Sequence, residues 1–468
     1  MDLQKLTAVK PQTRQIEWQK LGFTAFLHYG MNTFTNREWG TGKENPGQYR
    51  PARLDTDQWC EALQSAGIKA CVFTAKHHDG FCLWDTAYTT HSVMSSPCPQ
   101  DVVASLAKSC GKYGLKLGLY LSPWDMHEPS YGSGQAYNDF FCGQLEELTT
   151  RFGKLYSLWF DGACGEGPNG KKQIYDWDRY YALIRRHQPD AVIASVGPDV
   201  RWIGNEAGGT RASEWSVVSA KLQNAHKIAA DSQQSDDTRF REQGVKHQDE
   251  DLGSRQALQN ETDLVWYPAE VDVSIRPGWF YHAEEDDKVK PLETLLHFYE
   301  TSVGGNAVLL LNIPPDTDGR IHESDCQRLG ALGGRLQAIF SRNLLDEPGT
   351  LIRAESADIT GLLRDRDEYW KSSAETVEIE IALPGPRKLS HLVLQEEIRE
   401  SQRIESFSVF SVSADSSNPK KIYAGTTVGF KKICRFDPVE TDRIRIIIKA
   451  SREFSTLRFA GAYFDDFS

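Results

Sequence analysis

The chain has 468 residues, of which 40% are hydrophobic and 11% aromatic, and its formal net charge is -12. This length predicts two domains, or three. The excess of acid argues against nucleic acid or an anionic membrane as a partner, because both reward clustered Lys and Arg. No apolar run approaches the roughly 20 residues that cross a bilayer, so the composition favours a soluble globular protein with a neutral ligand.

The nine cysteines include no CxxC pair. An odd number without paired spacing favours scattered reduced thiols over a disulfide framework or a zinc site. The N-terminal stretch "MDLQKLTAVKPQTRQIEWQK" lacks the charged-then-apolar layout of a secretory signal. We therefore expect a cytoplasmic protein, or an exported one whose signal peptide lies outside this sequence.

Apolar strand-like runs alternate with segments of helical period over the first 340 or so residues. This is the pattern of a βα-repeat fold. Two of the helices have recognisable ends: one begins at Asp55 and ends at Gly67, and another begins at Asp101 and ends at Gly114. The predicted strands cover residues 22–30, 68–80, 115–125, 155–162, 191–199, 263–274 and 306–316. Seven strands are visible in this way, and an eighth is left open.

A barrel is the simplest closure of this repeat. No GxGxxG or GxxxxGK[ST] motif follows any strand, so no nucleotide cofactor is signalled and we predict none. In a (β/α) barrel the chemistry gathers at the C-terminal ends of the strands. Polar and aromatic residues crowd those ends here: His28, His77, His78, Asp79, Trp124, Asp125, Asp161 and Asn312. The competing interpretation is that strand ends are loops and loops are polar. Because neighbours on a strand face opposite ways, we expect one of His77 and His78 to lie in the turn or to pack inward.

The last third of the chain follows a different pattern. The polar segment 232–262 predicts a solvated excursion or a mobile flap. From about Leu344 onward, short alternating runs with turn residues between them predict an antiparallel β-sandwich. We therefore predict a catalytic TIM-like (β/α) barrel over 1–342 and a sandwich over 343–468 that is either carbohydrate-binding-like or structural.

Two carboxylates are candidates for catalysis. Asp161 ends the apolar run "YSLWFDGACG", and Glu206 lies in the loop "RWIGNEAGGTR" over a neighbouring strand. Cleavage of a glycosidic bond needs such a pair, one to attack the anomeric carbon and one to protonate the leaving oxygen. Burial beside Trp202 and two glycines would raise the pKa of Glu206 and suit it to the acid role. The alternative is two loop carboxylates that meet a helix N-terminus or an arginine, and Glu214 and Glu270 are the next candidates for the acid.

Other side chains at the predicted rim fit a sugar ligand. Trp39, Trp124 and Trp279 offer planes that stack on a sugar face, although tryptophans are most often core residues. His28, His77 and His78 could donate hydrogen bonds to hydroxyl groups. Neither HxH nor HExxH spacing occurs, so we predict no metal.

A set of motifs carries a family resemblance. The stretches "FLHYGMNTF" with "NREWG", then "AKHHDGF", "LYLSPWD", "LWFDGA", "GNEAG" and "LLNIPPDTDGRI" resemble, in that order, glycoside hydrolase family 29, the α-L-fucosidases. The resemblance covers nearly the whole chain and implies a (β/α) barrel with fewer or distorted elements, a C-terminal β-sandwich and a retaining mechanism. By position Asp161 matches the family's nucleophile. The residues implied to bind fucose are His28, Glu38, Trp39, His77 and His78, to which we add Tyr120 and Trp124 as predicted substrate-binding residues.

Two further stretches look like one branch of that family. "GNEAG" and "VSIRPGWFYH" resemble the branch that acts on α-1,3/1,4-linked fucose, in which Glu206 matches the acid/base and Trp279 walls the pocket. No residue matches the arginine that some members place in the pocket.

Three functions follow as hypotheses. The first is a retaining exo-α-L-fucosidase for α-1,3/1,4-linked fucose in Lewis-type oligosaccharides, or a broader one that includes α-1,2-linked and aryl fucosides. The second is a barrel hydrolase for another sugar, and the third is an inactive carbohydrate-binding protein. The predicted partner is a fucosylated oligosaccharide, with no nucleic acid and no membrane, and the oligomeric state is left open.

Overall fold

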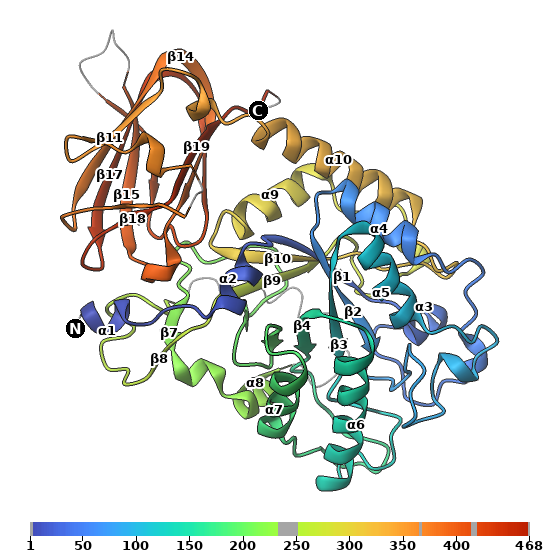
Figure 1. Cartoon of the computed structure of the whole chain (residues 1–468). Helices are drawn as coiled ribbons and strands as arrows, with labels where there is room; N and C mark the ends of the chain where they lie inside the picture. The colour runs from blue at the N-terminus through green and yellow to red at the C-terminus, as the bar shows by residue number, and fades with distance from the viewer. Residues whose placement is uncertain (1–2, 233–250, 365–366, 413–418, 467–468) are drawn as a thin grey trace.

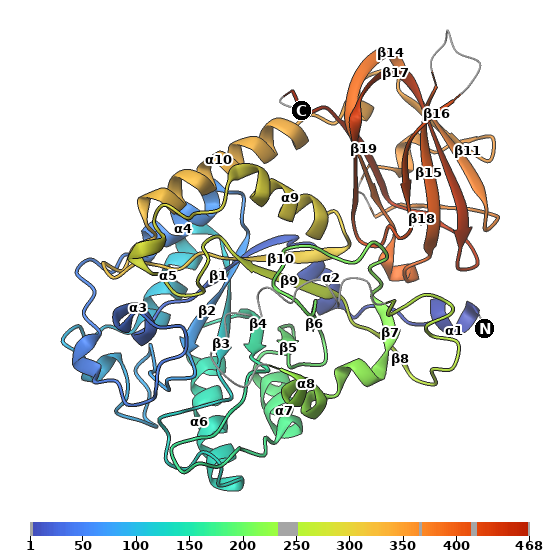
Figure 2. The ribbon, with the colours of Figure 1, turned by 180° about the vertical axis from the view of Figure 1, so that it is seen from behind.

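The structure, a computed structural model, describes residues 3–232, 251–364, 367–412 and 419–466. It has two parts: a barrel-like sheet ringed by helices, and a C-terminal set of antiparallel strands beside α9 and α10 (Figures 1 and 2). In the described ranges, no helix has both the length and the apolar character needed to cross a membrane. All nine cysteines are free thiols.

Eight parallel strands form the barrel sheet. Their order is β5-β4-β3-β2-β1-β10-β9-β6, and the two edge strands approach each other through a bridge between Ala194 and Val200. The strands are β1 (Phe23–Leu27), β2 (Ala70–Lys76), β3 (Lys116–Leu121), β4 (Leu155–Phe160), β5 (Val192–Ser195), β6 (Arg201–Trp202), β9 (Ala269–Ser274) and β10 (Ala307–Asn312). The predicted barrel is confirmed, and the missing eighth strand is β6, whose two residues are too few to give a periodic signal.

Helices cover the outside of the sheet (Figure 1). Around the barrel lie α2 (Thr13–Gln19), α4 (Thr56–Ser65), α5 (Val102–Tyr113), α6 (Gln135–Arg151), α7 (Trp177–His187), α8 (Ala225–Asp231), α9 (Leu292–Ser302) and α10 (Glu323–Phe340), with the short α1 (Leu3–Thr7) and α3 (Met31–Thr35) before β2. The two predicted caps are confirmed, because Asp55 accepts from the Gln58 N–H at 3.1 Å and Asp101 from the Ala104 N–H at 2.7 Å.

One predicted strand is wrong. The run 263–274 is two strands, β8 (Leu264–Trp266) and β9, separated at Pro268. Proline has no N–H for a sheet ladder, so the run breaks there. The first piece, β8, pairs antiparallel with β7 (Val217–Ser219) outside the barrel. Of the predicted polar excursion 232–262, residues 233–250 lie outside the described residues, and 251–262 form turns.

The C-terminal part is antiparallel, as predicted, but two of its strands are long. The larger sheet contains β11 (Leu351–Ala354), β12 (Ala357–Asp358), β14 (Val377–Gln395), β15 (Ile404–Val412), β16 (Lys420–Gly425), β17 (Lys432–Ser451) and β19 (Phe459–Tyr463), and β13 (Trp370–Lys371) pairs with β18 (Thr456–Leu457). Register shifts interrupt the pairing of β14 with β17, so β14 reads in the sequence as two shorter runs.

The barrel core extends into the sandwich. Val393, Ile433 and Tyr463 belong to the same buried cluster as the barrel's outer layer. The predicted domain boundary at 342/343 falls between α10 and the short 3-10 turn Leu344–Asp346, and it stays a prediction.

Candidate active site

Strand β4 aims Asp161 over the barrel interior. Leu158 and Phe160 pack outward against the helices, whereas Trp159 packs inward beside Tyr120 and Phe26. Side chains alternate along a strand, so Asp161 continues on the inward side of Trp159. The Tyr120 hydroxyl donates to Asp161 Oδ2 at 3.0 Å, and the Ala163 N–H donates to Oδ1 at 2.9 Å. The side chain of Asp161 is still 27% exposed. It is therefore held firmly and open to a ligand.

His77 and His78 follow β2 and lie together. The strand ends at Lys76 and the chain turns at Gly80, so strict alternation does not apply, and the two rings are 4.1 Å apart. The His77 ring stacks on Tyr120, and the His78 Nε2 atom is 3.7 Å from Asp161 Oδ2. Both histidines therefore lie beside Asp161. The sequence predicts that one of them lies in the turn or packs inward: His78 lies in the turn, and His77 opens it, because its carbonyl accepts from the Gly80 N–H at 3.0 Å.

Neighbouring groups fix the orientation of these rings. The Asn32 amide donates to His77 Nδ1 at 3.3 Å. Ser122 Oγ donates its single proton to the Trp124 carbonyl at 2.6 Å, so at 2.7 Å it accepts from the His78 Nδ1–H. Neutral His78 therefore directs an unprotonated Nε2 toward the pocket. The rings of Trp39 and Trp124 lie 5.2 and 5.1 Å from the His78 ring and form the wall on that side.

The three histidines at the strand ends are neutral at neutral pH. Burial lowers the pKa of His28 and of His78 to about 4, and it lowers the pKa of His77 well below 6.5. His28 Nδ1 is held by Asn312 Oδ1 at 2.8 Å. Burial also raises the pKa of Tyr120 well above 10. The pocket therefore offers uncharged donors and acceptors, which suit the hydroxyl groups of a neutral sugar.

Glu38 holds the loop that carries Trp279. Its Oε2 accepts from the Trp279 N–H at 3.0 Å, and its Oε1 accepts from the Phe280 N–H at 3.4 Å and lies 2.7 Å from His282 Nε2. The hydrogen bond with Glu38 raises the pKa of His282. The carboxylate of Glu38 thus fixes the backbone behind the pocket wall, and its predicted contact with substrate stays a prediction.

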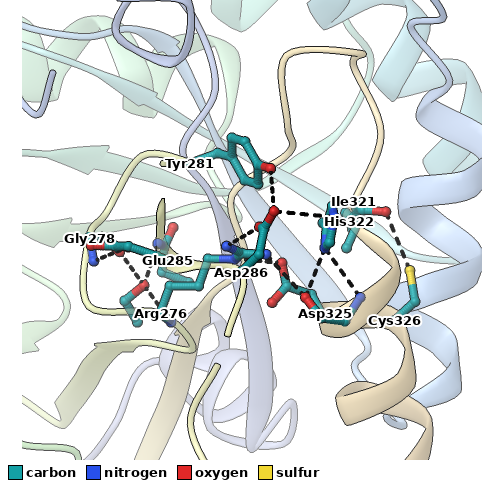
Figure 3. Close-up of polar contacts among 12 residues, drawn as sticks. Arg276, Gly278, Tyr281, Glu285, Asp286, Ile321, His322, Asp325 and Cys326 are labelled. Carbon is teal, nitrogen blue, oxygen red and sulfur yellow. Dashed lines mark hydrogen bonds and ion pairs between the residues drawn. The ribbon is translucent and has the colours of Figure 1, made fainter. Parts of the chain in front are cut away.

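The buried side chain of Arg276 anchors the start of the same loop through ion pairs (Figure 3). Arg276 donates from Nε to Asp325 Oδ2 at 2.8 Å and from Nη1 to Asp286 Oδ1 at 2.9 Å, and its guanidinium lies 4.8 Å from the Tyr281 ring centroid. Glu285 accepts from the Gly278 N–H at 2.9 Å. Sequence reasoning missed this network. Arg276 stands within the quoted "VSIRPGWFYH", but its main partner Asp325 is 49 residues away.

Glu206 lies in the loop after β6, half-buried, and Trp279 Nε1 donates to its Oε2 at 3.3 Å. The Trp279 ring is 5.2 Å from that of His28, which is 5.8 Å from that of His77. A continuous set of contacts therefore joins Glu206 to the groups around Asp161. The nearby Asp272 accepts from Trp202 Nε1, and its pKa is raised well above 3.8 by burial and then by the charge of Glu206.

Glu214 and Glu270, the next candidates for the acid, form contacts away from Asp161. Glu214 is buried and forms ion pairs with Arg201 and Arg211. Glu270 is buried inside the barrel, where it accepts from Trp159 Nε1 at 2.7 Å and where burial raises its pKa to about 7. Glu206 is the half-exposed one of the three carboxylates.

One group of side chains in the described ranges has the spacing of metal ligands. His77, His78 and Asp161 each offer an atom, and these atoms lie within 4.8 Å of one another. His78 donates from Nδ1 to Ser122, so its Nε2 is unprotonated, whereas His77 accepts at Nδ1 from Asn32, so its Nε2 carries the proton. The expectation that the protein needs no metal or cofactor stays a prediction.

Comparison with known proteins identifies the family. The model of the alpha-L-fucosidase family matches residues 15–339. Alpha-L-fucosidase 1 of Arabidopsis thaliana is 38% identical over 475 residues, which cover 98% of this chain and 88% of the relative.

Solved structures of similar proteins match nearly the whole chain. A Bacteroides ovatus structure is 44% identical with a TM-score of 0.87, over 99% of this chain and 75% of that one. A Ruminococcus gnavus GH29 fucosidase in complex with fucose is 28% identical with a TM-score of 0.83, over 98% and 95% of the two chains. This chain therefore belongs to the α-L-fucosidases of glycoside hydrolase family 29 and is a glycoside hydrolase.

Proposed function

We propose that this enzyme is a retaining exo-α-L-fucosidase that releases terminal α-1,3/1,4-linked L-fucose from branched, Lewis-type oligosaccharides. The observation that carries the mechanism is Asp161, an accessible carboxylate fixed by Tyr120 and surrounded by buried neutral groups. A carboxylate positioned in this way is suited to attack on an anomeric carbon.

In the first step Asp161 attacks the anomeric carbon and the glycosidic C–O bond breaks, while Glu206 gives its proton to the leaving oxygen. In the second step Glu206 takes a proton from water, and the water oxygen displaces Asp161 and releases fucose. His28, His77 and His78 bind the sugar hydroxyls as neutral rings. Trp39 and Trp124 close one side of the pocket, and Trp279 closes the side next to Glu206.

The nucleophile has a direct test. Asp161→Asn should lower kcat by about three orders of magnitude or more, roughly 4 kcal/mol of transition-state stabilisation, and leave fucose binding largely intact. NMR of the wild-type reaction should show α-fucose as the first-formed product. A variant that keeps a tenth of the wild-type kcat would remove Asp161 from this role, and β-fucose as the initial product would exclude retention.

The acid/base is tested through the leaving group. Glu206→Ala should lower kcat/KM severely on natural glycans, whose leaving alcohols need a proton, and only slightly on activated aryl fucosides. Equal losses on both classes would assign the proton to another carboxylate.

The linkage preference rests on the likeness of "RWIGNEAGG" and "VSIRPGWFYH" to the α-1,3/1,4-acting branch. In a Lewis-type trisaccharide the galactose beside the fucose offers further binding energy that can orient the reacting sugar. We expect Lewis trisaccharides and 3-fucosyllactose to have a higher kcat/KM than 2'-fucosyllactose and aryl fucosides. If either of the latter proves the best substrate, the enzyme is a broad fucosidase.

A further inference from the structure

The loop that carries Glu206, residues 203–216 (the acid/base loop), is closed on itself by buried charges. Glu214 pairs with Arg201 on β6, just before the loop, and with Arg211 within it, and Arg211 Nη1 also donates to the Ile203 carbonyl at 3.2 Å. These side chains are almost completely buried. The two ends of the loop are therefore tied to each other.

The C-terminal sandwich binds the second half of this loop. The buried side chain of Gln402 donates to the Glu214 carbonyl at 2.9 Å and accepts from the Ser216 N–H at 2.8 Å. Thr426 Oγ1 donates to the Ala212 carbonyl at 2.8 Å. The sandwich thus satisfies main-chain groups on both sides of Trp215, whose ring centroid lies 3.7 Å from the Arg452 guanidinium.

One buried carboxylate, that of Glu396, links the two backbone segments of the sandwich that contact the acid/base loop. Glu396 accepts from the N–H groups of Arg403 and Ile404, next to Gln402, at 2.7 and 2.9 Å. It also accepts from the Gly429 N–H, near Thr426, at 2.6 Å. Glu396 therefore links the backbone next to Gln402 with the backbone near Thr426.

The other side of the loop rests on α9. The Gly208 carbonyl accepts from the Ser302 hydroxyl at 3.3 Å, and Thr210 Oγ1 donates to the Thr301 carbonyl at 2.9 Å. Gly208 has φ +84°, and a Cβ there would lie 2.4 Å from the Phe298 ring. Glu206 thus stands on a segment held by α9 on one side and by the sandwich on the other.

We propose that the sandwich is a positioning element for the acid/base, with Gln402 and Thr426 as the residues that transmit its effect. The inference rests on the proposed role of Glu206. Proton transfer requires the acid to lie within hydrogen-bond reach of the leaving oxygen, so a loop displaced by about 1 Å loses rate in the step that needs the proton. Asp161, which directly follows β4, should be unaffected.

The experiment compares two substrates in the full-length enzyme. Thr426→Val and Gln402→Ala, singly and combined, are assayed for kcat/KM on 3-fucosyllactose and on an aryl fucoside with an activated leaving group. We expect the double variant to lose about tenfold or more on 3-fucosyllactose and less than about threefold on the aryl fucoside. In the pH profile of kcat/KM, the limb at high pH reports loss of the proton from the acid, and this limb should move in the double variant. Thr426→Ser, which keeps the hydroxyl, should retain wild-type rates.

Two parallel variants make the result decisive. Arg335 on α10 forms another contact between barrel and sandwich, an ion pair with Asp465 at 2.7 Å. Arg335→Gln removes this pair, and we expect it to lower thermal stability while changing kcat/KM equally on the two substrates. Glu206→Ala should show the selectivity at full strength. If Glu206→Ala loses equally on both substrates, the proposed role of Glu206 is wrong. If Glu206→Ala is selective but the Gln402 and Thr426 variants lose equally or not at all, the sandwich does not position the acid/base.

Discussion

His28, His77 and His78 lie buried at the same end of the barrel, and burial lowers the pKa of each. A charged imidazolium there would draw in counter-ions and would lose its acceptor atom. The neutral ring keeps one donor and one acceptor, and partners such as Asn312 and Ser122 select which nitrogen faces the pocket. Recognition of an uncharged sugar therefore depends on burial as much as on residue type.

Tyr120 is the residue that should most directly support Asp161. Tyr120→Phe removes the hydroxyl that donates to Asp161 Oδ2 and keeps the ring that stacks on His77 and Trp159. We expect kcat to fall roughly 10- to 100-fold, because a hydrogen bond to a charged group is worth about 1.5 to 3 kcal/mol. KM and the melting temperature should change little. Steady-state kinetics and thermal unfolding check this, and an unchanged kcat would show that the hydroxyl does not orient the carboxylate.

The segment between β9 and α9 shows how an element is held in a functional position. Arg276 is completely buried and is bound by Asp325 and Asp286 (Figure 3). The segment that follows Arg276 presents two N–H groups to Glu38 and the indole of Trp279 to Glu206. The buried ion pairs of Arg276 therefore hold the segment that carries Trp279, the residue that forms this wall of the pocket.

Removal of this anchor should affect both stability and activity. Arg276→Met leaves Asp325 buried without its cation, and we expect the free energy of unfolding to fall by about 3 kcal/mol, the usual cost of breaking a buried pair from one side. kcat/KM should also fall, because Trp279 is displaced. Urea unfolding and kinetics measure the two effects.

A double variant separates the causes. Adding Asp325→Leu should restore much of the stability, since an apolar pair can replace a buried ion pair. Arg53→Gln, which breaks the exposed pair with Asp318, should cost less than about 1 kcal/mol. If Arg276→Met behaves like Arg53→Gln, the buried network does not hold the loop.

Local rules recovered those elements whose signals are local. Asp55 and Asp101 cap their helices as spacing predicts, and Asp161 and His28 directly follow the continuous apolar runs that form β4 and β1. Long-range partners were beyond reach. Gln402 and Glu214 are 188 residues apart, and nothing near either residue signals the other. The strand β6 could not be predicted either, because its two residues are too few to show a periodic pattern.

At the scale of the whole molecule, the barrel and the sandwich share buried structure. Glu300 on α9 pairs with His391 and Arg435 of the sandwich at 3.0 and 2.9 Å, and the buried Asn306 accepts from the Phe430 N–H at 2.7 Å. With the shared apolar core, these contacts favour cooperative unfolding of the two parts.

Buried titratable groups act on stability in two opposite directions. Burial raises the pKa of Asp79 to about 8 and that of Glu396 to about 7, so their contribution to stability is full below pH 4 and is lost as pH rises through those values. The histidines work the other way. Their folded pKa lies below the unfolded value of about 6.5, so the unfolded chain binds more protons between pH 6.5 and 4, and stability falls as pH falls.

A single substitution isolates the histidine effect. His28 has a folded pKa of about 4, and His28→Asn cannot take up the proton in either state. Between pH 6 and 4.5, the unfolding free energy of the wild type should therefore fall more steeply than that of the variant, by about 1.2 kcal/mol per pH unit. Any constant cost of the substitution shifts the variant's curve without changing this difference in slope. Urea unfolding at several pH values measures both curves, and parallel curves would mean that His28 takes up its proton as readily in the folded enzyme as in the unfolded chain.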